Sequence, residues 1–318
     1  MSQVLVISGH PNLDASNTNK VILNQLSDHF DDIEVRQLDR LYPNYQIDVE
    51  AEQAALVKAD VVVLQFPFYW YSIPALLKKW IDDVFSYNFA YGAKGDKLKG
   101  KDLVLSFTIG GPEESYTPLG YNHFSIEELL KPLEQTAYLA GMNYVKPIYT
   151  HSMVYIAGVY NKLEEVETRA RSHADRLQTR IEDLIQSPEN RISKFVTQWF
   201  AQFDELPEST DDFTRYLSAD IKWSAPEGTF SGHDGFRDWY SIVKRTFKPD
   251  CHHQIEQIEV RREDNNYAVE LRIRLLADTY PESTLRGESI NLLVNEVWKV
   301  SLDDTRITIH DYHVDPVS

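Results

Sequence analysis

The residue types best suited to chemistry lie in three stretches, each of which follows a run of apolar residues. Residues 9–19 (GHPNLDASNTN) supply hydroxyl and amide side chains at the predicted start of a helix, where free backbone N–H groups attract phosphate. Residues 66–72 (FPFYWYS) supply a cluster of aromatic rings. Residues 108–116 (TIGGPEESY) contain two glycines, which let the backbone approach a ligand closely.

These three stretches together match the needs of an isoalloxazine ring, the flat redox group of a flavin. Such a ring must be held by its polar edge, with N–H donors near the end where negative charge develops on reduction. Each stretch also has a simpler interpretation. Residues 9–19 can be a capped helix behind a polar loop, since they lack the glycine spacing of a dinucleotide fingerprint or a Walker loop. The aromatic residues can be a hydrophobic cover over the end of a sheet.

The pattern around these stretches predicts the elements that would bring them together. Apolar runs predict strands, and apolar residues at a helical period predict helices between them. The predicted strands are 3–8, 33–39, 60–66, 102–108 and 144–148, and the predicted helices are one around 22–26 and those over 51–59, 74–85, 125–140 and 164–185. Alternating strands and helices form an α/β, doubly wound parallel sheet, whose ligands bind at the carboxyl ends of the strands. All three stretches fall at such ends.

Composition restricts the classes of function. The 318 residues carry a net charge of −17 with an acidic excess in both halves, which argues against nucleic-acid binding. The one cysteine, Cys251, excludes an intramolecular disulfide and favours a cytoplasmic protein. No apolar run approaches the roughly 20 residues of a membrane span. The N-terminus, MSQVLVISGHP, lacks the basic segment of a signal peptide. No metal site is expected.

Six segments of residues 1–185 carry a family resemblance. In chain order they are GHPNLDASNTNK, YPNYQIDVEAEQ, LQFPFYWYSIPALLKKWIDDVF, FAYG, TIGGPEESYTPLGYN and LLKPLEQTAYLAGM. This half resembles the flavodoxin-like NAD(P)H:quinone oxidoreductases, most closely the glutathione-regulated potassium-efflux ancillary flavoproteins. The resemblance implies a flavin, hydride transfer from NAD(P)H through flavin N5 to a quinone, and a homodimer.

The resemblance also implies a role for each matching residue. The flavin phosphate would be held by His10, Ser16, Asn17, Thr18 and Asn19. The ring would be bound and covered by Pro67, Phe68, Tyr69 and Trp70, and its other edge held by Thr108, Ile109, Gly110 and Gly111. Tyr116 matches a tyrosine beside the transferred hydride. The substrate pocket would include Phe89 and Tyr91 of the partner subunit, together with Asn122.

Two departures from the mammalian-type members affect these expectations. Those members pair the tyrosine with a histidine in a GIH segment, whereas this chain has Gly120-Tyr121-Asn122 and places His123 one residue later. The resemblance therefore implies no catalytic histidine. The extension that helps hold adenine in those members is not visible here, which favours FMN over FAD.

A different pattern follows residues 186–190, which are a predicted linker. Helices are predicted over 192–203 and 235–246, and strands over 252–260, 267–277, 287–300 and 305–314. The chain is thus predicted to hold two domains, 1–186 and 190–318, the second of α+β class. The segment FTRYLSADIKWSAPEGTFSGHDGFRDWY and the long strands resemble the cone-shaped NTF2-like or SnoaL-like (ketosteroid-isomerase-like) domains. This resemblance implies a fold and no particular function.

Polar residues in the predicted strands of this domain could line its cavity. Glu296 and Trp298 share one strand face, and Asp311 and His313 share another with Ile307 and Ile309. Trp223 is expected in the same cavity lining. Such groups either transfer protons or serve as hydrogen-bonded structural residues. His252 and His253 are interpreted as strand surface.

Three functions follow from these patterns. The leading one is a flavin-dependent NAD(P)H dehydrogenase that reduces a quinone. The second is a regulatory flavoprotein that docks on a potassium-efflux antiporter in the membrane. The third makes the C-terminal cone an isomerase or hydratase acting on a cyclic small molecule.

Overall fold

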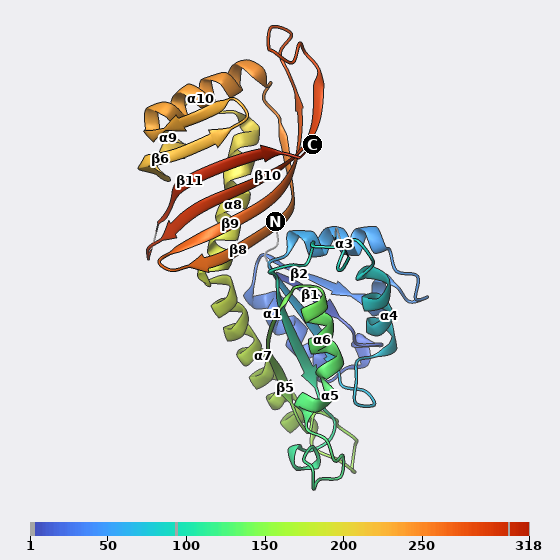
Figure 1. The fold of residues 1–318 in the computed structure, drawn as a ribbon. Coiled ribbons are helices and arrows are strands. Elements are labelled where there is room, and N and C mark those ends of the chain that lie inside the picture. Colours follow the sequence, from blue (N-terminus) through green and yellow to red (C-terminus); the bar gives the residue numbers. More distant parts are fainter. Residues whose placement is uncertain (1–3, 93–94, 305, 318) are drawn as a thin grey trace. The chain divides into compact units, whose positions relative to one another are not determined.

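The computed structural model describes residues 4–92, 95–304 and 306–317. The chain forms two compact units that divide between Gln186 and Ser187, and each unit has its own hydrophobic core (Figure 1). Within the described part of the chain, no helix combines the length and the apolar character that crossing a membrane requires.

The first unit is built on a five-stranded sheet with the order β2-β1-β3-β4-β5, and every pairing is parallel. Its strands are β1 (Val4–Ser8), β2 (Ile33–Gln37), β3 (Val61–Pro67), β4 (Asp102–Thr108) and β5 (Asn143–Thr150). Every residue of β1 and β3 is buried, as expected for parallel strands covered on both faces. The order is that of flavodoxin-like folds, which confirms the predicted sheet. The residue predicted to begin its first strand, Gln3, lies outside the described residues.

Helices cover both faces of this sheet because the strand side chains alternate between the faces. The longer helices are α1 (Asn19–His29), α3 (Val49–Lys58), α4 (Ala75–Val84), α6 (Lys131–Leu139) and α7 (Leu163–Ile185). Short turns of helix are η1 (Leu13–Ala15), α2 (Leu38–Leu41), η2 (Glu113–Ser115) and α5 (Ile126–Leu129). On one face, Val4 and Val6 pack with α1 and α7. On the other, Leu5 and Ile7 pack with α3, α4 and α6.

The helix predicted over 125–140 is divided into α5 and α6 at Leu130. Pro132 has no N–H to donate to the carbonyl of Glu128, so the two helices cannot share a continuous hydrogen-bond ladder. Ser125 and Glu128 form a capping box at the start of α5, as the sequence Ser-x-x-Glu favours.

The second unit contains a six-stranded sheet with the order β7-β6-β11-β10-β9-β8. Its strands are β6 (Leu217–Ala225), β7 (Gly228–Ser231), β8 (His252–Glu263), β9 (Asn266–Asp278), β10 (Ser289–Leu302) and β11 (Ile307–Pro316). The four long strands confirm the predicted pattern, although Thr305, where the last was predicted to begin, lies outside the described residues. β6 and β7 are not predicted by the sequence because the buried side chains of β6 do not alternate regularly.

Three helices complete this unit: α8 (Pro188–Glu205), α9 (Asp211–Thr214) and α10 (Gly232–Thr246). α8 begins earlier than predicted, within the residues interpreted as a linker. The Ser187 hydroxyl accepts the Asn190 N–H at 3.2 Å, and Pro188 occupies the first turn, where its missing N–H has no consequence. The linker prediction is therefore wrong for most of residues 186–190.

The inward face of β11 also differs from the prediction. Ile309 and Tyr312 are both buried, at 0% and 3% exposed. They are three positions apart, whereas residues on one face of a regular strand are an even number of positions apart. The register of β11 shifts between Ile309 and Asp311, and a bulge of this kind reverses the alternation of side chains beyond it. Asp311 and His313 therefore do not share a face with Ile309. His313 instead bonds Asp315 at 2.8 Å near the surface.

Candidate functional site

The three predicted ligand-binding stretches begin at the carboxyl ends of neighbouring strands. β1, β3 and β4 are adjacent in the sheet, and backbone hydrogen bonds join their ends. The Gly9 N–H donates to the Gln65 carbonyl at 2.9 Å, and the Phe68 N–H donates to the Thr108 carbonyl at 2.8 Å. Residues 9–19, 66–72 and 108–116 thus emerge along one edge of the sheet, and we call them the loop cluster.

The start of α1 forms the polar part of the loop cluster. Thr18 is the N-cap residue, but its side chain accepts no N–H of the helix. The Ser16 hydroxyl accepts the Asn19 N–H at 2.9 Å, while the side chain of Asn17 is exposed. Hydroxyl groups therefore surround a helix N-terminus, where the partial positive charge and free N–H groups suit a phosphate.

His10 belongs to the loop that leads into this helix N-terminus, and it is 9% exposed. Its Nδ1 accepts the Asn12 N–H at 3.1 Å. Burial lowers the pKa of His10, although the nearby Asp39 opposes this shift. The ring is therefore neutral at neutral pH with its proton on Nε2, which can donate to an anion.

The aromatic stretch is held in a tight turn. Tyr69 and Ser72 exchange two backbone hydrogen bonds of 3.0 Å, and the residues between them, Trp70 and Tyr71, have φ angles of 47° and 65°. Positive φ at both central positions is the requirement of a type I′ turn. The turn leaves Trp70 91% exposed, whereas Phe68 is 8% exposed and belongs to the core. The loop thus presents an exposed indole on a well-defined backbone turn at the sheet edge.

Gly110 and Gly111 supply space, since neither adopts the left-handed conformation. A Cβ atom on Gly110 would lie 2.9 Å from Cγ2 of Val154, and one on Gly111 would lie 3.4 Å from Cε2 of Tyr116. The preceding residue, Ile109, is fully buried. The backbone of this loop therefore borders the site without a side chain in between.

Tyr116 lies next to His151, with ring centroids 5.3 Å apart. The Nδ1–H of His151 donates to the Gly111 carbonyl at 3.3 Å, so the free lone pair is on Nε2. Burial raises the pKa of Tyr116, with a further contribution from Tyr71, and burial lowers the pKa of His151. At neutral pH the tyrosine keeps its proton and the imidazole is neutral. Sequence reasoning missed His151, although its place just after β5 marks the same sheet edge.

A chain of hydrogen bonds, exposed at Arg176 and buried from His173 onward, connects α7 with the loop cluster. Its members are absent from the predicted site apart from Asn19 and Thr108. In order, the bonds are Arg176–Thr150 Oγ1 at 2.6 Å, Thr150 Oγ1–His173 Nδ1 at 2.9 Å, His173 Nε2–Ser106 Oγ at 2.8 Å, Ser106 Oγ–Gln65 Oε1 at 2.6 Å, Gln65 Nε2–Asn19 Oδ1 at 2.7 Å and Asn19 Nδ2–Thr108 Oγ1 at 3.0 Å.

The chemistry of each group fixes the direction of this chain. Ser106 gives its proton to an amide oxygen, so it must accept from Nε2 of His173, and Nδ1 then accepts from Thr150. Every bond therefore donates toward Thr108. The hydroxyl proton of Thr108 is then available to an acceptor in the loop cluster, and Asn19 is held by two partners.

This chain of hydrogen bonds requires a neutral His173. The free energy of unfolding of the protein is therefore expected to depend on pH. Burial and the nearby Arg176 lower the pKa of His173 to about 3, whereas an unfolded histidine titrates near 6.5. Between these values the unfolded state binds one more proton. We expect this group to reduce the free energy of unfolding by about 1.4 kcal/mol per pH unit as the pH falls from about 6.5 to about 3.

Denaturant titrations of the native chain and of His173→Gln at several pH values measure this contribution. The variant should be less stable at pH 7. Between about pH 3 and about pH 6.5 its unfolding should take up about one proton fewer than that of the native chain, so its free energy of unfolding should change less steeply with pH. His29→Gln is the matched control, because His29 is exposed on α1 and pairs with Glu182. An identical pH slope in His173→Gln and the native chain would contradict the expectation.

The predicted substrate-pocket residues lie in different environments. Phe89 is 8% exposed within the core, whereas Tyr91 is 41% exposed and lines a groove of about 340 Å³ beside α4 and α6. Asn122 accepts a hydrogen bond from the Tyr71 hydroxyl at 3.1 Å, which joins its loop to the aromatic turn. His123 is exposed and has a φ of 63°.

Comparisons with known proteins assign both halves. Residues 2–179, more than half of the chain, match the family model described as a flavodoxin-like fold. The chain belongs to the flavodoxin-like fold family. Residues 196–310 match the model of the SnoaL-like domain. Both resemblances predicted from the sequence are thereby confirmed, and the chain combines a flavodoxin-like unit with a SnoaL-like one.

Three relatives illustrate this family membership. A Bacillus subtilis protein named as an uncharacterized NAD(P)H oxidoreductase, YdeQ, is 39% identical over 200 residues, which is 62% of this chain and 94% of the relative. The glutathione-regulated potassium-efflux system ancillary protein KefF of Enterobacter sp. is 43% identical over 148 residues, 46% of this chain and 82% of the relative. General stress protein 14 of Treponema denticola, crystallised with FMN, is 36% identical with a TM-score of 0.51, over 56% of this chain and 98% of that one.

The residues of the loop cluster fit a flavin mononucleotide. Hydroxyl groups and free N–H groups at the start of α1 suit its phosphate, and the Thr108 proton is directed by the buried chain of hydrogen bonds. Gly110 and Gly111 leave the backbone of this loop uncovered by side chains of its own, so the backbone itself can meet the edge of a ring.

Proposed function

We propose that residues 1–186 form an FMN-dependent NAD(P)H:quinone oxidoreductase domain, and that the second unit, which begins at Ser187 and not at residue 190 as predicted, forms an appended binding domain. The observation that carries this proposal is the meeting of a helix N-terminus, an exposed aromatic turn and a glycine pair at one edge of the parallel sheet. The relative crystallised with FMN supports FMN over FAD, and the relative named as an NAD(P)H oxidoreductase supports the electron donor.

When bound, the flavin supplies an acceptor for the hydride of NAD(P)H and a donor of two electrons to a quinone. The chain's own residues bind and orient it. The phosphate would be held by His10, Ser16, Asn17, Thr18 and Asn19. The ring would be bound and covered by Pro67, Phe68, Tyr69 and Trp70, and its other edge would be held by Thr108, Ile109, Gly110 and Gly111.

Tyr116 has the properties of a hydrogen-bond donor to the substrate. A phenol keeps its proton at neutral pH, burial raises the pKa of Tyr116 further, and the ring lies between the glycine loop and His151. A donor placed at a quinone oxygen stabilises the negative charge that develops there during reduction. The neutral His151 beside it positions the tyrosine ring.

An exposed apolar surface near the site favours the predicted homodimer. Leu119 and Tyr121 are 100% and 85% exposed, and the hydrogen bond from Tyr71 to Asn122 joins their loop to the aromatic turn. Exposed clusters of this kind mark interaction sites. We propose that a second copy of the chain covers this surface and completes the substrate pocket with Tyr91, because Phe89 is buried in the core of its own subunit.

Replacing Leu119 and Tyr121 by aspartate should weaken the dimer at least tenfold, because two charges would have to be desolvated in the interface. Sedimentation equilibrium measures the dissociation constant. Leu163→Asp is the control, since Leu163 is an exposed residue at the start of α7. A monomeric native chain, or an unchanged dissociation constant in the double variant, would contradict the proposed interface.

A second candidate function is regulation of a potassium-efflux antiporter, which the similarity to KefF supports. Two assays of the full chain separate the candidates. Oxidation of NAD(P)H that depends on added quinone and on FMN supports the reductase. Co-fractionation with a potassium transporter, without quinone-dependent oxidation of NAD(P)H, would contradict the reductase function and support the regulatory function.

A further inference from the structure

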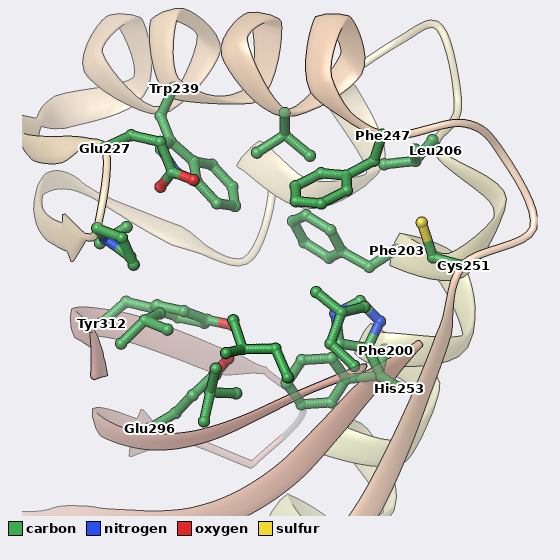
Figure 2. A pocket seen from close by; sticks show the side chains of 17 residues that line it. Phe200, Phe203, Leu206, Glu227, Trp239, Phe247, Cys251, His253, Glu296 and Tyr312 are labelled. Atoms are coloured by element: carbon green, nitrogen blue, oxygen red, sulfur yellow. The ribbon is translucent and has the colours of Figure 1, made fainter. Parts of the chain in front are cut away.

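The second unit encloses a cavity of about 110 Å³ that has no place in the proposed reductase (Figure 2). Aromatic rings form much of its wall, contributed by Phe200, Phe203, Trp239, Phe247 and Tyr312. Two carboxylic acids also line it. Glu227 lies in the exposed turn between β6 and β7, and Glu296 lies on β10 with 5% exposure. The cavity therefore extends from an acidic mouth to a buried acid.

Glu296 is held in place by its neighbours. The Trp298 Nε1–H donates to its Oε2 at 2.8 Å, and the hydroxyl of Tyr312 also hydrogen-bonds to the carboxyl group. Figure 2 shows Glu296 and Tyr312 on the wall opposite Glu227 and Trp239. Trp223 is not part of the lining, because it is fully buried and stacks against Tyr312 at 3.7 Å between ring centroids.

Burial raises the pKa of Glu296 to about 7, although the bonds from Tyr312 and Trp298 and the nearby His253 favour its charged form. Both forms of the carboxyl group are therefore present near neutral pH. A buried carboxyl costs free energy that an apolar residue on β10 would not, so its presence among aromatic rings points to a polar ligand.

His253 corrects the interpretation of residues 252–253 as strand surface. Its side chain is 15% exposed, lines the cavity and packs against Phe200 with 5.0 Å between ring centroids. Nδ1 bonds Asp204 at 2.5 Å, and the His253 N–H donates to the same carboxyl group at 3.0 Å. His252 remains exposed, as predicted. The hydrogen bonds to Asp204 thus hold the His253 side chain in place as a polar part of the cavity wall.

We propose that this cavity binds an uncharged single-ring phenol whose hydroxyl group hydrogen-bonds to Glu296. The volume is of the order of an engineered 150 Å³ protein cavity that holds benzene. Flat aromatic walls suit a flat ring. Glu227 and Glu296 repel an anionic ligand, and none of the described residues that line the cavity is lysine or arginine. This inference is independent of the proposed reductase.

Fluorine NMR of the full chain with 4-fluorophenol tests the proposal. The phenol should bind saturably, and fluorobenzene, which lacks the hydroxyl, should bind at least tenfold more weakly. The anion 4-fluorobenzoate should also bind at least tenfold more weakly. Glu296→Gln keeps the shape of the side chain but removes the charged acceptor, and we expect it to weaken 4-fluorophenol binding roughly tenfold.

Two further variants locate the binding. Leu292→Phe adds volume at a half-buried lining residue and should abolish phenol binding, whereas Glu270→Gln, outside the cavity lining on β9, should leave it unchanged. Failure of 4-fluorophenol to saturate at millimolar concentration would overturn the proposal. Undiminished binding in Leu292→Phe, or in a folded Glu296→Gln, would overturn it as well. Should Glu296→Gln not fold, Leu292→Phe decides the outcome alone.

Discussion

Replacement of Gly110 by valine is expected to abolish flavin binding while the parallel sheet remains folded. A Cβ atom at this position would lie 2.9 Å from Cγ2 of Val154, and the branched side chain would occupy space beside the loop cluster. Val154 is 42% exposed, so its side chain can move and the sheet is spared. Fluorescence titration with FMN measures binding, and circular dichroism reports the fold.

A paired variant separates the two steric effects of this substitution. Val154→Ala alone should keep flavin affinity, and in Gly110→Val with Val154→Ala the clash between these two side chains is removed. We expect the double variant still to lack flavin, because the valine continues to block the approach of the ring edge. Native FMN affinity in Gly110→Val would show that residues 108–111 do not hold the ring.

Tyr116→Phe should retain flavin but slow reduction of the quinone. The hydroxyl of Tyr116 is protonated at neutral pH, as an ordinary phenol is, and its loss removes one donor to the developing negative charge. Loss of one such donor typically reduces the rate about 100-fold. Stopped-flow absorbance separates reduction by NAD(P)H from reoxidation by quinone.

Tyr138→Phe is the matched control for this substitution, because Tyr138 lies on α6, outside the loop cluster and the proposed dimer surface, and is 58% exposed. Its rates should equal those of the native chain. Both half-reactions unchanged in Tyr116→Phe would remove Tyr116 from the mechanism. A loss of flavin in that variant would assign the residue to cofactor binding.

The sequence predicts the first unit well because its physical signals are local. Buried parallel strands read as continuous apolar runs, and the loops at their carboxyl ends follow from topology alone. The tight turn at Trp70 and Tyr71 is not visible in this way, because neither residue type favours a positive φ. Its geometry depends on the two hydrogen bonds between Tyr69 and Ser72.

Residues that act through distant contacts escape sequence reasoning. His173 and Ser106 lie 67 positions apart and meet only when α7 packs on the sheet. His253 has the sequence context of an ordinary strand residue, and only the fold brings Asp204 of α8 beside it. On β11, a bulge directs Tyr312 inward in place of His313, and no feature of the surrounding residue types marks the bulge.

The absorbance spectrum of the purified full chain tests most directly whether a flavin binds at the loop cluster. We expect a yellow protein with the spectrum of a bound flavin, and release of FMN, identified by its mass, on denaturation. Gly110→Val prepared in parallel should be colourless. A colourless native chain that does not bind FMN or FAD at micromolar concentration would contradict the account.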